Sequence, residues 1–153
     1  MSGTTVVSVV VEIDAPQELV WEVVTDFAAY PEWNPFTVRV DTTGGVGDDV
    51  VLHLPDPAVP GELFTTVETI RVVAAPHHLQ YDTGSSIPGM LAVRDQWVRD
   101  LGDGRSSYAT TDAFSGEIAQ VVYDLQADWV KAGFDAVAHA VKARAELLHA
   151  ARR

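Results

Sequence analysis

The sequence predicts a single α+β domain in which a curved antiparallel sheet is covered by one long C-terminal helix. Three observations support this fold class. The chain has 153 residues, of which 47% are hydrophobic, and this size suits one globular domain with its own core. Residues 36–114 carry strand signals separated by turn residues, with no helical period long enough to compete. After residue 115 the apolar positions recur at helical spacing.

The N-terminal segment predicts one strand and two short helices. Residues 4–13 are rich in Val and Thr and alternate loosely, which indicates a strand whose apolar face is formed by Val7, Val9, Val11 and Ile13. Asp14 is expected to cap a short helix that begins near Pro16. Pro31 and Pro35 then interrupt the helical pattern and favour a second, tighter turn of helix before the chain becomes extended.

The central segment predicts six further strands in an antiparallel meander. Their expected ranges are 37–41, 49–54, 63–74, 78–83, 91–101 and 106–114. The glycine- and serine-rich turn at residues 84–89 is expected to form a lip over the interior. From Ser115, a plausible N-cap, a helix of about 30 residues would be roughly 45 Å long and would cross the whole concave face. Because a sheet that curls around one helix tends to leave space beneath it, we expect an internal cavity.

Composition excludes several classes of function. Ten Lys and Arg against 22 Asp and Glu leave a formal net charge of −12, which disfavours nucleic acid and anionic lipid surfaces as partners. The chain has no cysteine, which excludes disulfides, thiolate zinc sites and cysteine nucleophiles. No apolar run reaches the roughly 18 residues of a membrane span, and the apolar N-terminus lacks the basic flank of a signal peptide. We therefore expect a cytoplasmic protein without stable membrane insertion. Its expected oligomeric state, which the sequence does not determine, is a monomer or a homodimer.

Two segments carry a resemblance to a known family. Residues 11–35, VEIDAPQELVWEVVTDFAAYPEWNP, resemble the opening signature of the START-like (Bet v 1-like, SRPBCC) superfamily, specifically its polyketide cyclase/dehydrase and lipid-transport branch. Residues 111–116, TDAFSG, and the terminal helix resemble the family's last strand and closing helix. The resemblance implies a helix-grip fold, in which a seven-stranded curved antiparallel sheet wraps around the last helix and encloses a cavity. It specifies function less closely, because members include aromatase/cyclases, hydrophobic-ligand carriers, stress proteins and chaperone regulators.

Alternation along the strands predicts which side chains face the cavity. In the hairpin that turns near residue 75, pairing Ile70 with Tyr81 and Val72 with Leu79 places these residues on one face together with Glu68. Glu68 lies midway along its strand and could look into the cavity or remain solvated at its rim.

The hairpin that turns at residues 102–105 is expected to contribute the acidic groups. If these four residues form the loop, Asp95 lies directly opposite Asp112. Arg94 and Gln96 are then expected on the outer face. The inner face would hold Leu91, Val93, Asp95, Trp97, Arg99, Tyr108, Thr110, Asp112 and Phe114.

An inward pair of carboxyl groups suggests acid/base chemistry. Asp95 and Asp112 could not both ionise cheaply in a partly dry cavity, so one pKa should rise, as in general acid and base pairs. A register slip of two residues, or neutralisation by Arg99 and backbone groups, would remove this effect. Tyr81 and Tyr108 are candidate donors to a carbonyl or enolate oxygen. The alternative for both tyrosines is core packing with a satisfied hydroxyl.

The remaining inward residues are candidate contacts for a hydrophobic ligand. They are Glu68, Ile70, Val93, Trp97, Phe114 and Trp129. Either tryptophan could instead be ordinary core. No two histidines stand four residues apart, and no glycine-rich turn leads into a helix, so we expect no metal site and no nucleotide cofactor.

These patterns favour one function over two others. The leading interpretation is a polyketide cyclase/dehydrase-like enzyme that binds a hydrophobic oxygenated small molecule and promotes cyclisation, dehydration or isomerisation by cofactor-free acid/base catalysis. The first alternative is a non-catalytic carrier or sensor of a lipid or other hydrophobic ligand, for which an aromatic cavity suffices. The second alternative, a regulator that binds another protein through its outer surface, applies if the cavity is filled.

Overall fold

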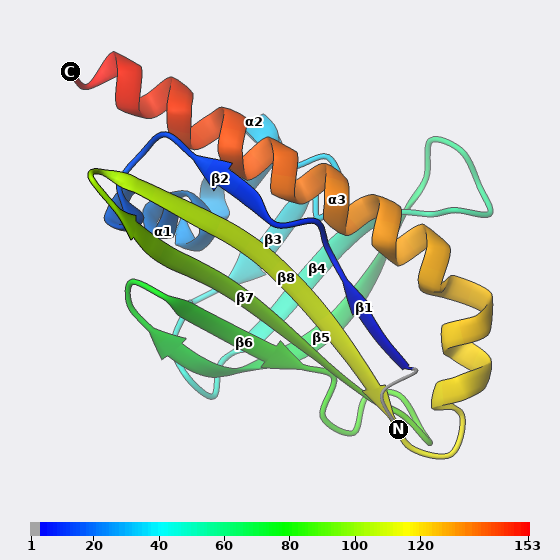
Figure 1. The fold of residues 1–153 in the computed structure, drawn as a ribbon. Coiled ribbons are helices and arrows are strands. Elements are labelled where there is room, and N and C mark those ends of the chain that lie inside the picture. Colours follow the sequence, from blue (N-terminus) through cyan, green and yellow to red (C-terminus); the bar gives the residue numbers. More distant parts are fainter. Residues whose placement is uncertain (1–3) are drawn as a thin grey trace.

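The computed structural model describes residues 4–153, so the first three residues of the predicted domain lie outside the described residues. Its strands are β1 (Thr5–Val7), β2 (Val11–Ile13), β3 (Arg39–Thr42), β4 (Asp49–Pro55), β5 (Leu63–Ala74), β6 (His78–Asp82), β7 (Leu91–Gly102) and β8 (Arg105–Ser115). Within residues 4–153 they form one antiparallel sheet in the order β1-β8-β7-β6-β5-β4-β3, and β2 also pairs with β8. The helix α3 (Ala119–Ala151) lies across the sheet (Figure 1). The predicted α+β helix-grip fold is confirmed, with eight strands instead of seven.

The extra strand arises because the predicted first strand is split. β1 and β2 both pair with β8, but their registers differ by one residue. The shift reverses the alternation before the break, so Val7 is 49% exposed and its predicted inward position is wrong. Ser8 stabilises the break because it donates its backbone N–H to the carbonyl of Thr110, while its hydroxyl accepts the N–H of Thr110, both at 2.9 Å.

Two short helices and a 3-10 turn join β2 to β3, as predicted. They are α1 (Gln17–Thr25), η2 (Phe27–Ala29) and α2 (Tyr30–Trp33). Pro16, and not Asp14, is the N-cap of α1, and its carbonyl accepts the first backbone hydrogen bonds of the helix. The backbone N–H of Asp14 instead donates to Glu146 on α3 at 2.9 Å. α1 buries one apolar stripe, formed by Leu19, Val20, Val23 and Val24.

The long helix begins later than its sequence suggests. Ser115 is the last residue of β8, and α3 starts at Ala119. Between them Gly116 adopts φ +108°, and a Cβ at this position would lie 2.5 Å from the carbonyl oxygen of Gly89. The N–H of Ile118 donates to the same oxygen at 3.1 Å, so the lip at residues 84–89 is held against the start of α3.

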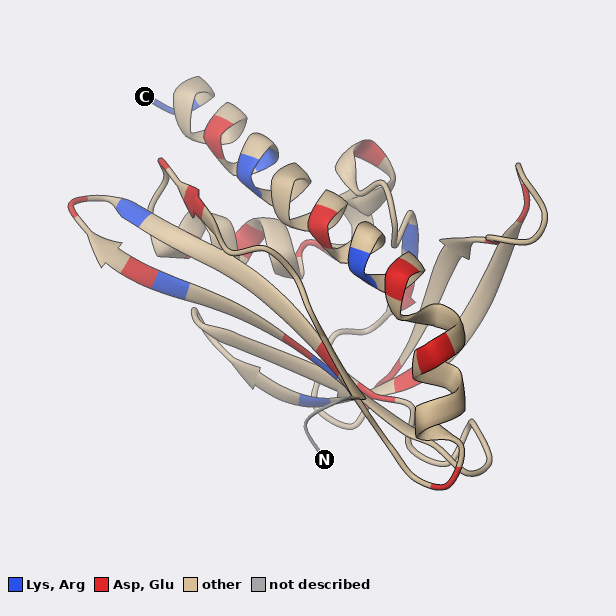
Figure 2. Ribbon diagram, turned by 45° about the vertical axis from the view of Figure 1, so that its right-hand side comes forward, with Lys and Arg blue, Asp and Glu red and all other residues tan. Residues whose placement is uncertain are grey.

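The basic residues in the C-terminal half of α3 are paired with acids. Lys142 contacts Glu146 on the same helix at 2.8 Å, and Arg152 contacts Glu22 on α1 at 2.7 Å. Figure 2 shows basic and acidic residues interspersed along α3. The Lys142 pair lies within α3, whereas Arg152, the residue directly after α3, links the end of this helix to α1. Within residues 4–153, no helix combines the length and apolar character needed to cross a membrane.

The β5–β6 hairpin contains a bulge. Ile70 pairs with Tyr81, as predicted. The register then shifts by one residue, so that Val72 pairs with Gln80 and Val73 pairs with Leu79. The predicted pairing of Val72 with Leu79 is therefore wrong, because a bulge places two residues of one strand against one of its partner.

Candidate functional site

The turn between β7 and β8 determines which residues of β7 face the helix. Asp103 and Gly104 both have positive φ, +54° and +73°, which defines a two-residue turn closed by the pairing of Gly102 with Arg105. The register then shifts between residues 100 and 102, so that Leu101 is an extra residue on β7. A glycine in the left-handed region, here Gly102 at φ +85°, is typical of such a bulge.

This bulge overturns the predicted acid pair. Arg94, and not Asp95, lies opposite Asp112, while Asp95 lies opposite Thr111. Because side chains alternate between the two faces, the one-residue shift moves every β7 side chain to the face opposite the predicted one. Arg94 and Gln96 are both buried, and only the β8 half of the predicted face is confirmed.

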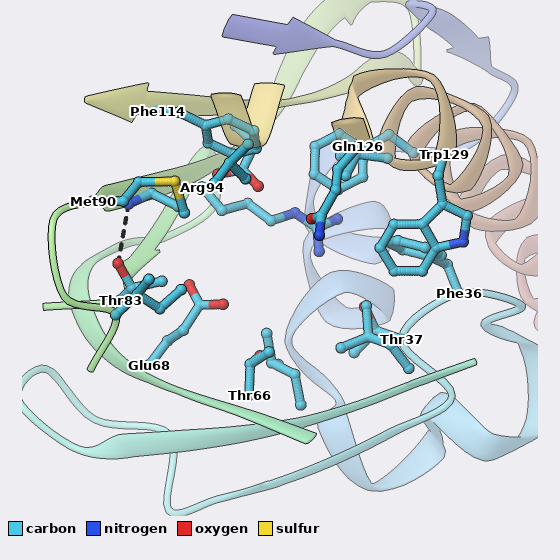
Figure 3. Close-up of a pocket in the computed structure, with 18 of the residues that line it drawn as sticks. Phe36, Thr37, Thr66, Glu68, Thr83, Met90, Arg94, Phe114, Gln126 and Trp129 are labelled. Atoms are coloured by element: carbon cyan, nitrogen blue, oxygen red, sulfur yellow. Dashed lines mark hydrogen bonds between the residues drawn. The ribbon is translucent and has the colours of Figure 1, made fainter. Parts of the chain in front are cut away.

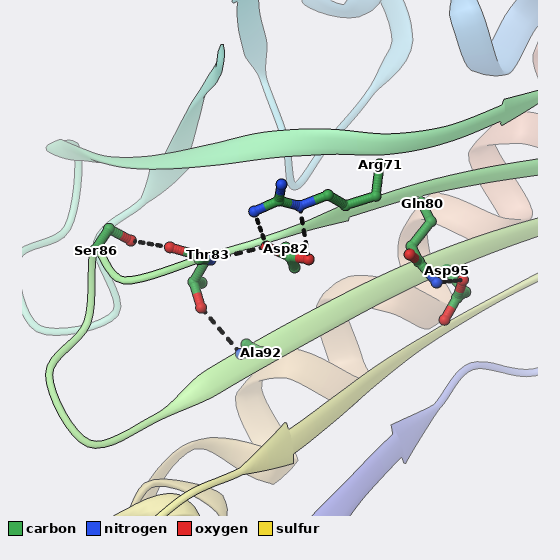
Figure 4. A network of polar contacts seen from close by, with 8 residues as sticks. Arg71, Gln80, Asp82, Thr83, Ser86, Ala92 and Asp95 are labelled. Carbon is green, nitrogen blue, oxygen red and sulfur yellow. Dashed lines mark hydrogen bonds and ion pairs between the residues drawn. The ribbon is translucent and has the colours of Figure 1, made fainter. Parts of the chain in front are cut away.

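Asp95 belongs to a polar cluster on the face of the sheet away from the cavity. It accepts a hydrogen bond from Gln80 Nε2 at 2.9 Å and contacts His78 Nε2 at 2.6 Å. Trp97 stacks on the His78 ring with centroids 3.7 Å apart. Figure 4 shows Asp95 and Gln80 on this face, together with the ion pair between Arg71 and Asp82. The predicted inward positions of Asp95, Trp97 and Val93 are therefore wrong.

A cavity of about 120 Å³ lies between the sheet and the first half of α3 (Figure 3). Most of its lining is apolar, and its polar side chains come from the strands, from the segments before β3 and after β6, and from α3. The lining residues are Phe36, Thr37, Leu52, Leu54, Phe64, Thr66, Glu68, Thr83, Ile87, Met90, Ala92, Arg94, Asp112, Phe114, Val122, Gln126, Trp129, Val130 and Phe134. Ile87 belongs to the lip at residues 84–89 and Met90 directly follows it, so the lip contributes to the cavity wall, as its sequence predicts.

Arg94 is the buried cation of this cavity. Its side chain reaches from β7 into the cavity centre (Figure 3). Nε donates to Thr110 Oγ1 at 3.0 Å and Nη1 donates to the Tyr81 hydroxyl at 3.2 Å. The guanidinium carbon lies 4.4 Å from the ring centroid of Phe134, a cation–π distance. These contacts fix the guanidinium group, which remains charged at any physiological pH.

Two carboxyl groups share the cavity with Arg94. The pKa of Glu68 is raised to about 8, first by burial and second by the charge of Asp112. Burial also raises the pKa of Asp112 to about 7, against the opposing effect of Arg94. Both groups can therefore gain or lose a proton near neutral pH, which is the property that general acids and bases need.

A hydrogen-bond network of residues outside the cavity lining holds Arg94 in position. Tyr108 donates to Gln96 Oε1 at 2.6 Å, and Gln96 Nε2 donates to the Tyr81 hydroxyl at 3.4 Å. Burial raises the pKa of both tyrosines, so their hydroxyls stay protonated. Neither tyrosine lines the cavity. The Tyr81 hydroxyl contacts Arg94 directly, and the Tyr108 hydroxyl is linked to Arg94 through Gln96 and Tyr81.

Three aromatic residues from different parts of the chain form one wall. Trp129 on α3 packs against Phe36 with ring centroids 5.0 Å apart, and against Phe64 of β5 at 5.9 Å. Gly133, one turn further along α3, makes room for Phe36, because a Cβ there would lie 2.4 Å from its ring. We call Phe36, Phe64 and Trp129 the aromatic wall.

Sequence comparison assigns the chain to a family. The family described as polyketide cyclase / dehydrase and lipid transport matches residues 4–146. The chain belongs to this family. The predicted membership of the polyketide cyclase/dehydrase and lipid-transport branch is confirmed. No curated protein matches the chain in sequence.

Solved structures share the fold of this family member. The Zhui aromatase/cyclase from Streptomyces sp. R1128 is 24% identical, with a TM-score of 0.75 over 93% of each chain. Norcoclaurine synthase from Thalictrum flavum is 17% identical, with a TM-score of 0.67 over 95% of each chain. A START superfamily protein from Mycobacterium smegmatis is 18% identical, with a TM-score of 0.65 over 94% of this chain and 98% of the other. At these identities the similarity establishes the fold alone.

Four of the site residues predicted from the sequence line the cavity. Glu68, Asp112, Phe114 and Trp129 line it, while Ile70 is buried in the core without lining it. Sequence reasoning missed Arg94 and the two phenylalanines of the aromatic wall. The Gly102-Asp103-Gly104 turn is the signal that could have identified Arg94, because it is compatible with a two-residue turn preceded by a bulge. Among residues 4–153, no group of three or more acidic or histidine side chains is arranged to bind a metal ion.

Proposed function

We propose that the protein is a polyketide cyclase/dehydrase-like enzyme that acts on a hydrophobic oxygenated small molecule by acid/base catalysis without a cofactor. The observation that carries this proposal is that Arg94 shares a mostly apolar cavity with two carboxyl groups that titrate near neutral pH. Membership of the family supports a cyclase-like or ligand-binding function. The cavity then supplies the groups that proton transfer beside a carbonyl requires.

Each polar group has a distinct role in the proposed reaction. The substrate carbonyl oxygen accepts a hydrogen bond from Arg94. The Asp112 carboxylate removes a proton from the neighbouring carbon, and the C–H electron pair becomes the enolate, whose oxygen Arg94 stabilises. Glu68, which is mostly protonated at pH 7, donates its proton to a departing hydroxyl in a dehydration, or to carbon in an isomerisation. Tyr81 and Tyr108 act as positioning residues for Arg94.

Deuterium exchange tests this proposal without knowledge of the natural substrate. Acetophenone, a single-ring ketone, exchanges its methyl protons with D₂O through an enolate, and NMR measures the rate. We expect the protein to accelerate this exchange, and Asp112→Asn to slow it by about 10²-fold or more. Glu62→Gln, a charge-removing change at an exposed site, should retain the wild-type rate. Equal rates for the wild type and for Asp112→Asn would refute the catalytic role.

A carrier function is the alternative that the apolar lining favours. A carrier would release an intact small molecule on denaturation, which mass spectrometry detects, and Asp112→Asn would leave its affinity for that molecule unchanged. The volume of about 120 Å³ argues against a long lipid chain, because it is below the roughly 300 to 1,000 Å³ of pockets for drug-sized ligands.

A further inference from the structure

The unpaired polar atoms of the interior gather around the cavity. Within residues 4–153, the buried side-chain oxygens without a hydrogen-bond partner are Thr37 Oγ1, Thr66 Oγ1 and Asp112 Oδ1. All three residues line the cavity. Because folded proteins pair most of their buried polar groups, this clustering makes the wall of the cavity an exception in the protein interior.

Arg94 adds an unpaired donor to these oxygens. In the part of the chain that the structure describes, its hydrogen bonds come from Nε and Nη1, and Nη2 has no partner. No carboxylate oxygen of residues 4–153 lies within 4.0 Å of its nitrogens. Arg94 is only 5% exposed, and a buried cation without a close counter-ion is unfavourable by several kcal/mol. A negatively charged ligand group would offset this cost.

The rest of the cavity limits the size and shape of the ligand. The aromatic wall offers flat surfaces against which a ring can pack, and Figure 3 shows Trp129 and Phe36 on the far side of the Arg94 guanidinium from Glu68. The volume of about 120 Å³ is smaller than the roughly 300 to 1,000 Å³ of pockets for drug-sized ligands. One ring with a short polar group matches this space.

We propose that the cavity selects single-ring aromatic ligands that carry a planar, delocalised oxyanion, with the oxyanion on Arg94 Nη2 and the ring against the aromatic wall. A carboxylate has this chemistry, and so does the enolate of a single-ring ketone. The inference rests on the proposed function only in that both place the ligand in the same cavity. The carboxyl groups of Glu68 and Asp112 face the same space from β5 and β8, and in their protonated forms each could donate a second hydrogen bond to the anion.

Benzoate and benzamide provide the direct test, because they share shape and size and differ in charge. Calorimetric titration of the wild-type protein at pH 7 should show benzoate binding at least about 10-fold more tightly, as expected for a charge-assisted hydrogen bond. The net charge of −12 opposes benzoate at long range, so general electrostatic attraction cannot produce this preference. Equal affinities, or a preference for benzamide, would overturn the proposal.

Variants then test the role of Arg94. Arg94→Gln should reduce the preference for benzoate to within about twofold, whereas Arg71→Gln, which removes an arginine on the opposite face, should keep it. A preference that survives in Arg94→Gln overturns the assignment. If Arg94→Gln fails to fold, Arg94→Lys keeps the charge without the guanidinium and should weaken benzoate binding more than benzamide binding.

Size selection is tested on the wild-type protein alone. The two-ring anion 2-naphthoate should bind at least about 10-fold more weakly than benzoate, because the aromatic wall blocks the second ring. Equal binding of the two anions would refute the single-ring limit.

The acetophenone experiment separates this proposal from the catalytic one. Selective benzoate binding without deuterium exchange would refute only the catalysis, whereas exchange without benzoate selectivity would refute only the ligand class.

Discussion

Replacing Glu68 with Gln should stabilise the protein at alkaline pH, although the change removes a proposed proton donor. Burial and the nearby Asp112 raise the pKa of Glu68 from 4.5 to about 8. The folded state therefore holds this proton more tightly than the unfolded state. Its contribution to stability is fully present below pH 4.5 and is lost progressively as the pH rises through 8.

The size of this effect follows from the pKa difference. At about 1.4 kcal/mol for each pKa unit, ionisation of Glu68 costs the folded state at most about 5 kcal/mol above pH 8. Solvent that reaches the cavity screens the carboxylate, so we expect about half of this limit, ~2 to 3 kcal/mol. For a chain of this length, 1 kcal/mol changes the melting temperature by about 2 to 4 °C. Glu68→Gln should therefore melt about 4 to 12 °C above the wild type at pH 8.5, and within about 2 °C of it at pH 4.5.

The assay is thermal unfolding followed by circular dichroism from pH 4.5 to pH 9. Glu62→Gln is the matched control, because it removes the same charge at an exposed position just before β5. Its melting temperature should follow the wild type across the whole range. If the advantage of Glu68→Gln does not grow with pH, or if the variant is less stable at pH 8.5, the ionised carboxylate is paired in the folded state and the reasoning fails.

Three further substitutions have defined outcomes. Asp112→Asn should also gain stability over the wild type with rising pH in the same melting series, mainly between pH 4 and pH 7, and this gain should level off above pH 7, because burial raises that pKa from 3.8 to about 7; a pH-independent effect would contradict this. Gly116→Ala should destabilise the protein by more than about 1 kcal/mol in urea unfolding, because its φ is +108° and the added Cβ would meet the carbonyl of Gly89. Gly133→Ala should cost about 1 to 3 kcal/mol through its clash with Phe36, whereas an open helix position would gain up to about 1 kcal/mol, so the sign of the change decides.

The elements of the fold could be predicted because their signals are local and repeated. Helical spacing continues along α3 for 33 residues, and turn residues separate the strands of the meander. The errors fall where one residue changes a register. The break around Ser8 and the bulge after Ile70 each shift the pairing by one position, and composition alone does not reveal such shifts.

The site could be predicted only where no bulge intervened. The alternation of β8 correctly places Asp112 and Phe114 on the inner face, and Glu68 lies on the straight part of β5 before its bulge. On β7 both possible faces contain charged and large side chains, so hydrophobicity does not choose between Arg94 and Asp95. Which of the two residues faces the cavity depends on the turn at residues 102–105, and the positive φ angles of Gly102, Asp103 and Gly104 define this turn.

The extra residue on β7 also sets the sign of the charge that the cavity presents. Uniform alternation would have grouped Asp95 with Glu68 and Asp112, an arrangement that favours a cationic ligand. The observed register exchanges Asp95 for Arg94, so that a fixed cation faces two acids that are easily protonated. Benzylamine, which is cationic at pH 7, should therefore bind at least about 10-fold more weakly than benzoate in calorimetric titration. The net charge of −12 attracts benzylamine and repels benzoate at long range, so only the local field around Arg94 can produce this order, and tighter binding of benzylamine would mean that the acids control the cavity.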